Sequence, residues 1–350
     1  MKVRAAEWSV GAPPRRAGQR VGYLGRRAGF YLVTAVAACT LNFIIPRFMP
    51  GDPVRTLVDK LERQTGQPAT PEQIASFRAF FGDPTANLGQ QYLDYWGRLL
   101  HFDLGVSTHF YPMPVMAIIG AALPWTLLLA GSAVILAFTI GVAIGAIVGM
   151  KPGRWADTIV LPLGAFAGAL PPFWIAMLLI YFVAFRTGWF PLSGVYSTTV
   201  EPGFNLAFVL SVLHHGFLPL VATISASAGF WVLQMRNMTV TTVTEDYVLL
   251  ARAKGLSRAR VVLRYAARNA LLPPITNLAT ALGGVVGGLL FTELVFGYPG
   301  VGTVLVQSVA AKDFPVMQGV FLMVTLSILL GNFIADSLYV VLDPRTRSVT

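Results

Sequence analysis

The sequence predicts an all-α, polytopic membrane protein with six transmembrane helices. Hydrophobic residues make up 55% of its 350 residues and charged residues only 12%, about half of the usual charged share. So few charges cannot cover a water-facing surface of this size. The chain also contains six charge-free stretches that are each long enough to cross a hydrocarbon core. The expected spans run over about 28–46, 125–150, 158–185, 216–236, 272–292 and 316–340.

Proline and glycine shape several of these spans. Prolines at 112, 114 and 124 should leave the second span as one helix from about Trp125 to Met150. Pro171 and Pro172 remove two backbone donors, so they should kink or split the third span, which could then line a path. Small residues at four-residue spacing allow close helix contacts, either within this chain or with a second subunit. They are Gly141, Gly145 and Gly149 in span two and Gly283, Gly284, Gly287 and Gly288 in span five.

Basic residues set the expected orientation. With the N- and C-termini in the cytoplasm, 18 of the 26 Lys and Arg residues lie inside, as the positive-inside rule requires. The net charge of +10 is then a topology feature and predicts no nucleic-acid partner. Residues 1–27 form a basic cytoplasmic tail, residues 28–347 the transmembrane domain, and residues 48–109 a small helical cap on the outer side. The apolar run continues past Cys39, which favours an uncleaved anchor over a signal peptide.

Residue types that carry catalysis or hold cofactors are scarce. One cysteine excludes an internal disulfide and a thiolate-rich zinc site. The four histidines, His101, His109, His214 and His215, all fall on the expected outer side and are interpreted as interfacial polar residues rather than metal ligands. No Gly-x-Ser-x-Gly elbow and no P-loop occur. We therefore expect no catalytic, cofactor or metal site in this chain, and any ATP that drives it must bind another subunit.

A cytoplasmic segment over about 242–270 is the most informative loop. Thr242 and Glu245 are spaced as a capping box at a helix start. That helix should run to about Lys254, with Gly255 ending it in a left-handed conformation. Ser257 should cap a second helix that carries an arginine stripe, formed by Arg260, Arg264 and Arg268. The segment is either a basic juxtamembrane helix on lipid or a rigid knob that another protein grips.

A family resemblance rests on motifs spread along residues 28–347. Residues 245–248, 251–257 and 268–273 resemble the coupling loop of the oligopeptide/dipeptide class of ABC-transporter permeases. Leu249 and Leu250 depart from the coupling motif of other ABC classes. Further segments are similar to that family in the same order: 50–53, 103–107, 170–174, 188–194, 293–296, 299–302, 313–315 and 342–345.

This resemblance implies the type I permease fold of ABC importers and a place in the bacterial cytoplasmic (inner) membrane. The Pro-Gly-Asp-Pro segment at 50–53 resembles the first of the two permease subunits. The implied partners are a homologous second permease subunit, two ATP-binding subunits that hold ATP and Mg, and an extracytoplasmic solute-binding protein. The implied solute is a peptide, although the family also includes importers of oligosaccharides and nickel. The coupling residues would be Glu245, Asp246, Tyr247, Ala251, Arg252, Lys254, Gly255 and Leu256.

The segment that follows span five predicts an outer gate. Tyr298, Pro299 and Gly300 favour a turn and Gly302 permits a further bend, so the chain should dip back near the outer mouth. The expected gate residues are Glu293, Phe296, Pro299, Gly300 and Gly302. A plain surface turn is the competing interpretation.

An ion-coupled secondary transporter is the main alternative function. It would need buried ionisable residues, and only Glu293 and Asp336 approach the spans. A membrane enzyme is a weaker third possibility, because the sequence offers no catalytic constellation.

Overall fold

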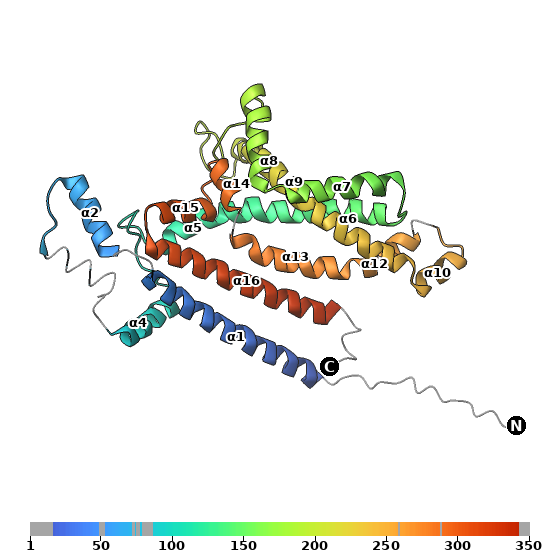
Figure 1. Ribbon diagram of the computed structural model, residues 1–350, viewed down its shortest axis with the longest axis horizontal. Coiled ribbons are helices and arrows are strands. Elements are labelled where there is room, and N and C mark those ends of the chain that lie inside the picture. Colours follow the sequence, from blue (N-terminus) through green and yellow to red (C-terminus); the bar gives the residue numbers. More distant parts are fainter. Residues whose placement is uncertain are drawn as a thin grey trace.

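The computed structural model describes residues 17–48, 53–71, 74, 78, 87–257, 260–287 and 289–342. Several expected segments therefore lie wholly or partly outside the described residues: 1–16 of the tail, 49–52 with most of the 50–53 motif, parts of the 48–109 cap, Gly288, and 343–350 with most of the closing motif. The described chain is a bundle of long helices, with the α2 and α4 region at one end and α10 at the other (Figure 1).

Within the part of the chain that the structure describes, five helical segments are long and apolar enough to cross a membrane, and a sixth is counted if one bent pair forms a single span. The five are 25–45, 115–149, 206–243, 264–287 and 314–337. They belong to α1 (Ala17–Phe48), α5 to α6 (Val115–Thr126, Leu127–Gly131 and Ser132–Gly149), α9 (Leu206–Val243), η3 to η4, and α16 (Phe314–Leu342). The η3 to η4 run comprises η3 (Val261–Ala266), α12 (Ala267–Ala270), α13 (Leu272–Gly284) and η4 (Val285–Gly287).

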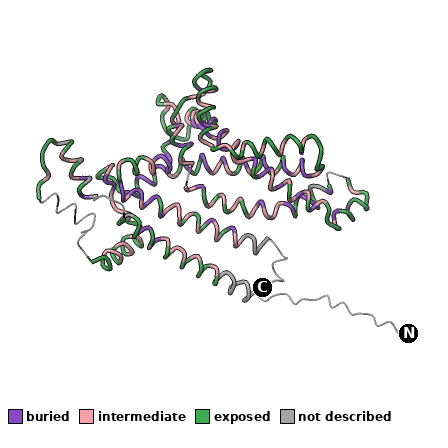
Figure 2. Tube along the Cα trace, viewed as in Figure 1, coloured by how far each residue is buried: buried purple, intermediate pink, exposed green. Residues whose placement is uncertain are grey.

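The bent pair is the expected third span. α7 (Trp155–Ala169) ends just before the two prolines and α8 (Pro172–Leu179) begins at the second, with a bend of 93° between them. Pro171 and Pro172 thus split this segment, as predicted, because Pro172 fits the first turn of a new helix. α8 and its continuation η2 (Ile180–Phe185) project from the bundle (Figure 1), and most of their residues are exposed or half-buried (Figure 2).

The second span begins earlier than expected. We predicted a helix from about Trp125, but helical structure begins at Val115, with Pro114 as the residue before it and Pro124 inside α5. A proline inside a helix removes one backbone hydrogen bond. The π-helical turn η1 (Leu127–Gly131) directly follows and keeps the segment continuous into α6.

Glycines bring α6 against α9, and the contacts lie within this chain. A Cβ added at Gly141 would lie 2.4 Å from the Trp231 Cβ, and one at Gly145 would lie 2.5 Å from the Val232 carbonyl oxygen. Gly149 meets the next turn of α9 in the same way. On α13, a Cβ at Gly283 would lie 2.5 Å from the Gly331 Cα of α16. Close backbone contacts of this kind are the main way helices associate in lipid, so they fix these helix pairs.

Short helices lie at both ends of the bundle. The described part of the 48–109 segment contains α2 (Pro53–Thr65) and α4 (Leu88–Leu100). α10 (Asp246–Ala253) follows α9, while α14 (Leu290–Val295) and α15 (Val301–Ala310) lie between η4 and α16. α1 packs along α16 (Figure 1), where Asp336 forms an ion pair with Arg27 and accepts a 2.7 Å hydrogen bond from Tyr31.

Candidate functional site

The start of α10 differs from the expected capping box. Thr242 belongs to the last turn of α9, and its hydroxyl donates to the Met238 carbonyl at 2.7 Å. Glu245 is the residue before α10 but its side chain makes no capping hydrogen bond. The capping-box prediction was wrong because a threonine hydroxyl can bond the carbonyl four residues back and remain inside a helix. Asp246 does place a carboxylate in the first turn of α10, where the helix dipole favours negative charge.

The end of α10 is as predicted. Gly255 has φ +72°, its N–H donates to the Arg252 carbonyl at 2.9 Å, and the Leu256 N–H donates to the Ala251 carbonyl at 3.4 Å. This hydrogen-bond pair is the Schellman motif, which needs a left-handed residue after the helix. Gly255 therefore fixes the direction in which the chain leaves α10.

One face of α10 packs inward and the other is exposed. Val248 and Ala251 are buried against Val261 and Ala266 of η3. Tyr247 and Leu256 are half-buried beside them. The remaining expected coupling residues are exposed: Glu245, Asp246, Arg252, Lys254 and Gly255.

Two leucines in the middle of α10 are exposed and were not among the expected coupling residues. Leu249 and Leu250 keep 48% and 56% of their surface exposed, although they lie on a short helix outside the apolar segments. Two adjacent exposed leucines give this short helix a small apolar surface. The same two positions had been noted in the sequence only as departures from a motif.

The segment after α10 is less regular than expected. The arginine stripe spans a π-helical stretch, η3, followed by the single turn α12. The Val261 N–H bonds the Ser257 backbone carbonyl at 3.0 Å. The Asn269 amide donates to the Tyr247 hydroxyl at 2.8 Å, so α12 and α10 are joined directly.

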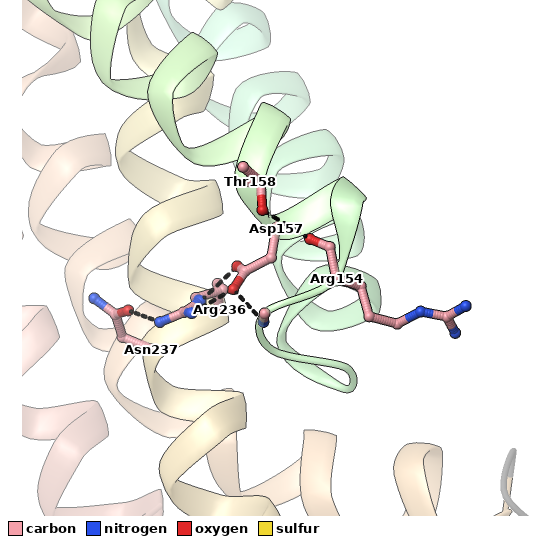
Figure 3. A network of polar contacts seen from close by, with 6 residues as sticks. Arg154, Asp157, Thr158, Arg236 and Asn237 are labelled. Atoms are coloured by element: carbon pink, nitrogen blue, oxygen red, sulfur yellow. Dashed lines mark hydrogen bonds and ion pairs between the residues drawn. The ribbon is translucent and has the colours of Figure 1, made fainter.

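A salt bridge ties α7 to α9 near the α10 end of the bundle (Figure 3). Arg236 binds Asp157 through two hydrogen bonds, Nε to Oδ1 at 2.9 Å and Nη2 to Oδ2 at 2.7 Å. The Gly153 N–H adds a third contact to the same carboxylate at 2.8 Å. A bidentate arginine fixes both distance and orientation. Sequence reasoning missed this pair because its members are 79 residues apart.

In the segment expected to form the outer gate, the Glu293 side chain is fully buried and caps a different helix from the one that contains Glu293. Its Oε2 accepts from the N–H groups of Gly302 at 2.8 Å and Thr303 at 3.4 Å, in the first turn of α15. Its Oε1 accepts from the Thr126 hydroxyl at 2.8 Å, and the Thr126 oxygen accepts from the Val301 N–H at 2.8 Å. The first three free N–H groups of α15 are thereby satisfied.

Glycine is required beside this carboxylate. A Cβ at Gly300 would lie 2.4 Å from the Glu293 Cδ, and one at Gly302 would lie 2.6 Å from the Leu290 Cα. The Leu290 Cα is backbone, and the Glu293 carboxyl group, although at the end of a side chain, is held in place by its hydrogen bonds to Thr126, Gly302 and Thr303. The two glycines expected at the gate therefore allow the α14 and α15 ends to meet.

The 296–300 turn is packed into the protein. Phe296 is buried against α8 and α9, and Tyr298 against Leu129 and Val195. The Gly194 N–H donates to the Phe296 carbonyl at 2.9 Å. Of the five expected gate residues, Glu293, Phe296, Gly300 and Gly302 are buried and Pro299 is exposed.

A second buried carboxylate joins two motifs that the sequence showed only as separate segments. Asp313 accepts from the Ser107 hydroxyl, and from the N–H groups of Thr108 at 3.2 Å and His109 at 3.0 Å. It also lies at the start of α16. The loop after α4 is thus held on the beginning of α16.

The histidines make local backbone contacts. His101 and His215 each bond a carbonyl four residues back, and His214 lies 2.9 Å from the Trp189 carbonyl. Among the residues that the structure describes, no group of three or more His, Cys, Asp or Glu could hold a metal ion.

Comparisons with known proteins agree with these motifs. The family model "Binding-protein-dependent transport system inner membrane component" matches residues 141–348. The di/tripeptide transport system permease protein DppB of Pseudomonas aeruginosa is 32% identical over 340 residues, which cover 93% of this chain and 99% of that protein. The oligopeptide transport system permease protein AppB of Bacillus subtilis is 31% identical, with coverage of 92% and 98%. The dipeptide transport system permease protein DppB of Escherichia coli K12 is 32% identical, with coverage of 93% and 98%.

The matched residues include the second half of α6, all of α9, the exposed short helix that follows α9, and the Glu293 segment. The family match, together with relatives that align over nearly their whole length, shows that the chain belongs to the family of membrane permease components of binding-protein-dependent ABC importers.

Proposed function

We propose that this chain is the first permease subunit of an ATP-driven importer that carries peptides into the cytoplasm. The three relatives above all bear names that specify peptide transport, which supports a peptide over an oligosaccharide or nickel. The observation that carries the mechanism is α10, a short helix with one face packed on η3 and an exposed face that contains Leu249 and Leu250.

The proposed partners are those that membership of this permease family implies. Two cytoplasmic ATP-binding subunits hold ATP and Mg, and one of them binds the exposed face of α10. A homologous second permease subunit completes the membrane pathway, and an extracytoplasmic binding protein delivers the peptide. The termini and α10 lie in the cytoplasm of a bacterial inner membrane, as the distribution of basic residues favours.

The packing around α10 suggests how movement could spread. α10 directly follows α9, which is packed on α6 through glycines and bound to α7 by the Asp157–Arg236 salt bridge. A displacement of α10 when the ATP-binding subunits close would therefore act on α6, α7 and α9 together. α7 would carry the displacement to the 93° bend at Pro171, and the whole rearrangement is a rigid-body transition between two states.

We further propose that the Glu293 segment forms the outer gate. Backbone that turns back at membrane depth is stable only when it is buried in protein or lines a cavity, and this turn is buried by α8, α9 and η1. The carboxylate then serves as a fixed cap that keeps the turn closed on α15 until the helices around it move.

Reconstitution of the purified complex tests the function. Proteoliposomes that hold the two permease subunits and the ATP-binding subunits should take up a labelled peptide only when ATP, Mg and the loaded binding protein are present. Uptake by this chain alone, driven by a proton or sodium gradient, would instead establish a secondary transporter. The ligand recovered from the cognate binding protein then identifies the solute.

Cysteine labelling tests the orientation separately. A cysteine at Ser197 should react with an impermeant reagent in intact cells, and one at Ser257 should react only after the membrane is opened. Labelling of position 257 from outside would reverse the orientation and contradict the assignment of α10 to the ATP-binding subunits.

A further inference from the structure

A basic hollow lies next to the coupling segment and has no role in the function proposed above. Arg264, Tyr265, Arg268 and Leu271 line it. The two arginines are exposed and four residues apart, so they lie on one helix face. Neither guanidinium forms an ion pair with any residue in the described ranges. Two adjacent positive charges without a counter-charge attract anions to this surface.

The position of the hollow indicates which kind of anion would bind there. An apolar segment long enough to cross a membrane begins at Arg264 and continues to Gly287. The arginines therefore lie where the chain leaves the hydrocarbon layer, at the depth of lipid headgroups. Tyr265 and Leu271 suit the same depth, because an aromatic ring with a polar tip and an aliphatic side chain can contact the glycerol and acyl region.

We propose that this hollow binds the headgroup phosphate of an anionic phospholipid. The planar guanidinium groups of Arg264 and Arg268 match the geometry of phosphate oxygens and can donate two hydrogen bonds each. Basic pockets at the cytoplasmic ends of transmembrane helices are favourable sites for such headgroups. The binding itself does not depend on which solute the importer carries.

The hollow is physically joined to α10, so a bound lipid would act on coupling. Asn269, next to Arg268, donates to Tyr247 of α10 at 2.8 Å. Ala266, between the two arginines, is fully buried in the cluster that holds Val248 and Ala251. A headgroup held by Arg264 and Arg268 would therefore stabilise the same small packed unit that carries the exposed face of α10. This consequence, unlike the binding, rests on the proposed function.

Lipid titration of the full-length chain tests the site. The chain is purified in detergent, stripped of lipid and titrated with phosphatidylglycerol or phosphatidylcholine, and binding is followed by native mass spectrometry. Each basic residue near an anionic headgroup contributes about 1 kcal/mol, so the Arg264→Gln/Arg268→Gln variant should bind phosphatidylglycerol about 30-fold more weakly. Arg98→Gln, an exposed arginine on α4 at the other end, is the matched control and should leave the affinity unchanged.

Each of the following results would overturn the assignment. Equal affinity for the two lipids, or unchanged phosphatidylglycerol binding in the double variant, removes the site. Inorganic phosphate that binds as tightly as phosphatidylglycerol shows a phosphate site with no lipid specificity. Loss of the ATP-binding subunits from the double variant with normal lipid binding assigns the surface to a protein contact. If the double variant does not fold, Arg264→Gln and Arg268→Gln are tested singly, with about fivefold losses expected, and no loss in either overturns the proposal.

Discussion

Gly255 offers a graded test of whether α10 acts as a rigid lever. Its φ of +72° is a conformation that residues with a Cβ adopt at a cost of about 1–2 kcal/mol, while asparagine tolerates it better. No atom lies within 4 Å of a Cβ added at this position. A substitution therefore meets no steric clash with neighbours, and its cost comes from the backbone alone.

The expected order of activity is glycine, asparagine, alanine and then valine. A cost of 1–2 kcal/mol makes the native end of α10 about 5- to 30-fold less favourable, and a β-branched valine should cost more than alanine. The assay is peptide uptake and ATP hydrolysis by the reconstituted complex, at equal amounts of inserted protein. Uptake should fall more than hydrolysis, since the pump is uncoupled rather than unfolded.

The refuting result is equally specific. Normal uptake by Gly255→Val at normal expression would show that the direction of the chain after α10 does not matter. Equal losses for asparagine and valine would show that the effect does not come from φ. Either result removes the lever from the mechanism.

Three further predictions follow from contacts inside the bundle. Thr126→Val removes the hydroxyl that a buried N–H and a carboxylate oxygen bind, so it should lower stability in detergent by about 2–4 kcal/mol. Thr126→Ser keeps the hydroxyl and should cost about 1 kcal/mol. Equal losses in the two variants would show that the hydroxyl has no such role. Asp157→Arg and Arg236→Asp should each lower ATP-driven uptake, and the double exchange should recover part of the lost uptake. Two fully active single variants would show that the salt bridge is dispensable. Gly145→Ala should lower the free energy of unfolding by about 1–3 kcal/mol through overpacking, as measured by thermal unfolding. Gly120→Ala is the control, because no atom lies within 4 Å of its added Cβ, and it should be neutral or stabilising. Similar behaviour of the two variants would contradict the close contact between α6 and α9.

Features that depend on nearby residues could be predicted from the sequence. The four-residue spacing of Gly141, Gly145 and Gly149 indicated a close helix contact, although not its partner, because spacing does not say which helix lies opposite. Gly255 indicated a left-handed helix end because few other residues adopt that conformation. The proline pair at 171–172 likewise predicted the split between α7 and α8.

Features that depend on distant residues could not be predicted. Asp157 pairs with Arg236, and Asp313 holds the loop at Ser107, across 79 and 206 residues. No local pattern specifies such partners. The prediction of a capping box at Thr242 was wrong for a related reason. The hydrogen bond of the Thr242 hydroxyl and the burial of this residue in α9 favour continuation of a long packed helix over the start of a new one.

The uninterrupted length of α9 has a consequence for the timing of transport. Its 38 residues correspond to about 57 Å, and the helical structure continues through the internal Pro219 from the loop that ends at Asn205 to the joint at Thr244 and Glu245. Communication between the two faces of the membrane then requires no segment to melt or refold. If α9 reorients as one body during transport, that motion falls in the range of microseconds to milliseconds. Slower turnover would then point to steps outside this helix, such as release of a partner or of the solute.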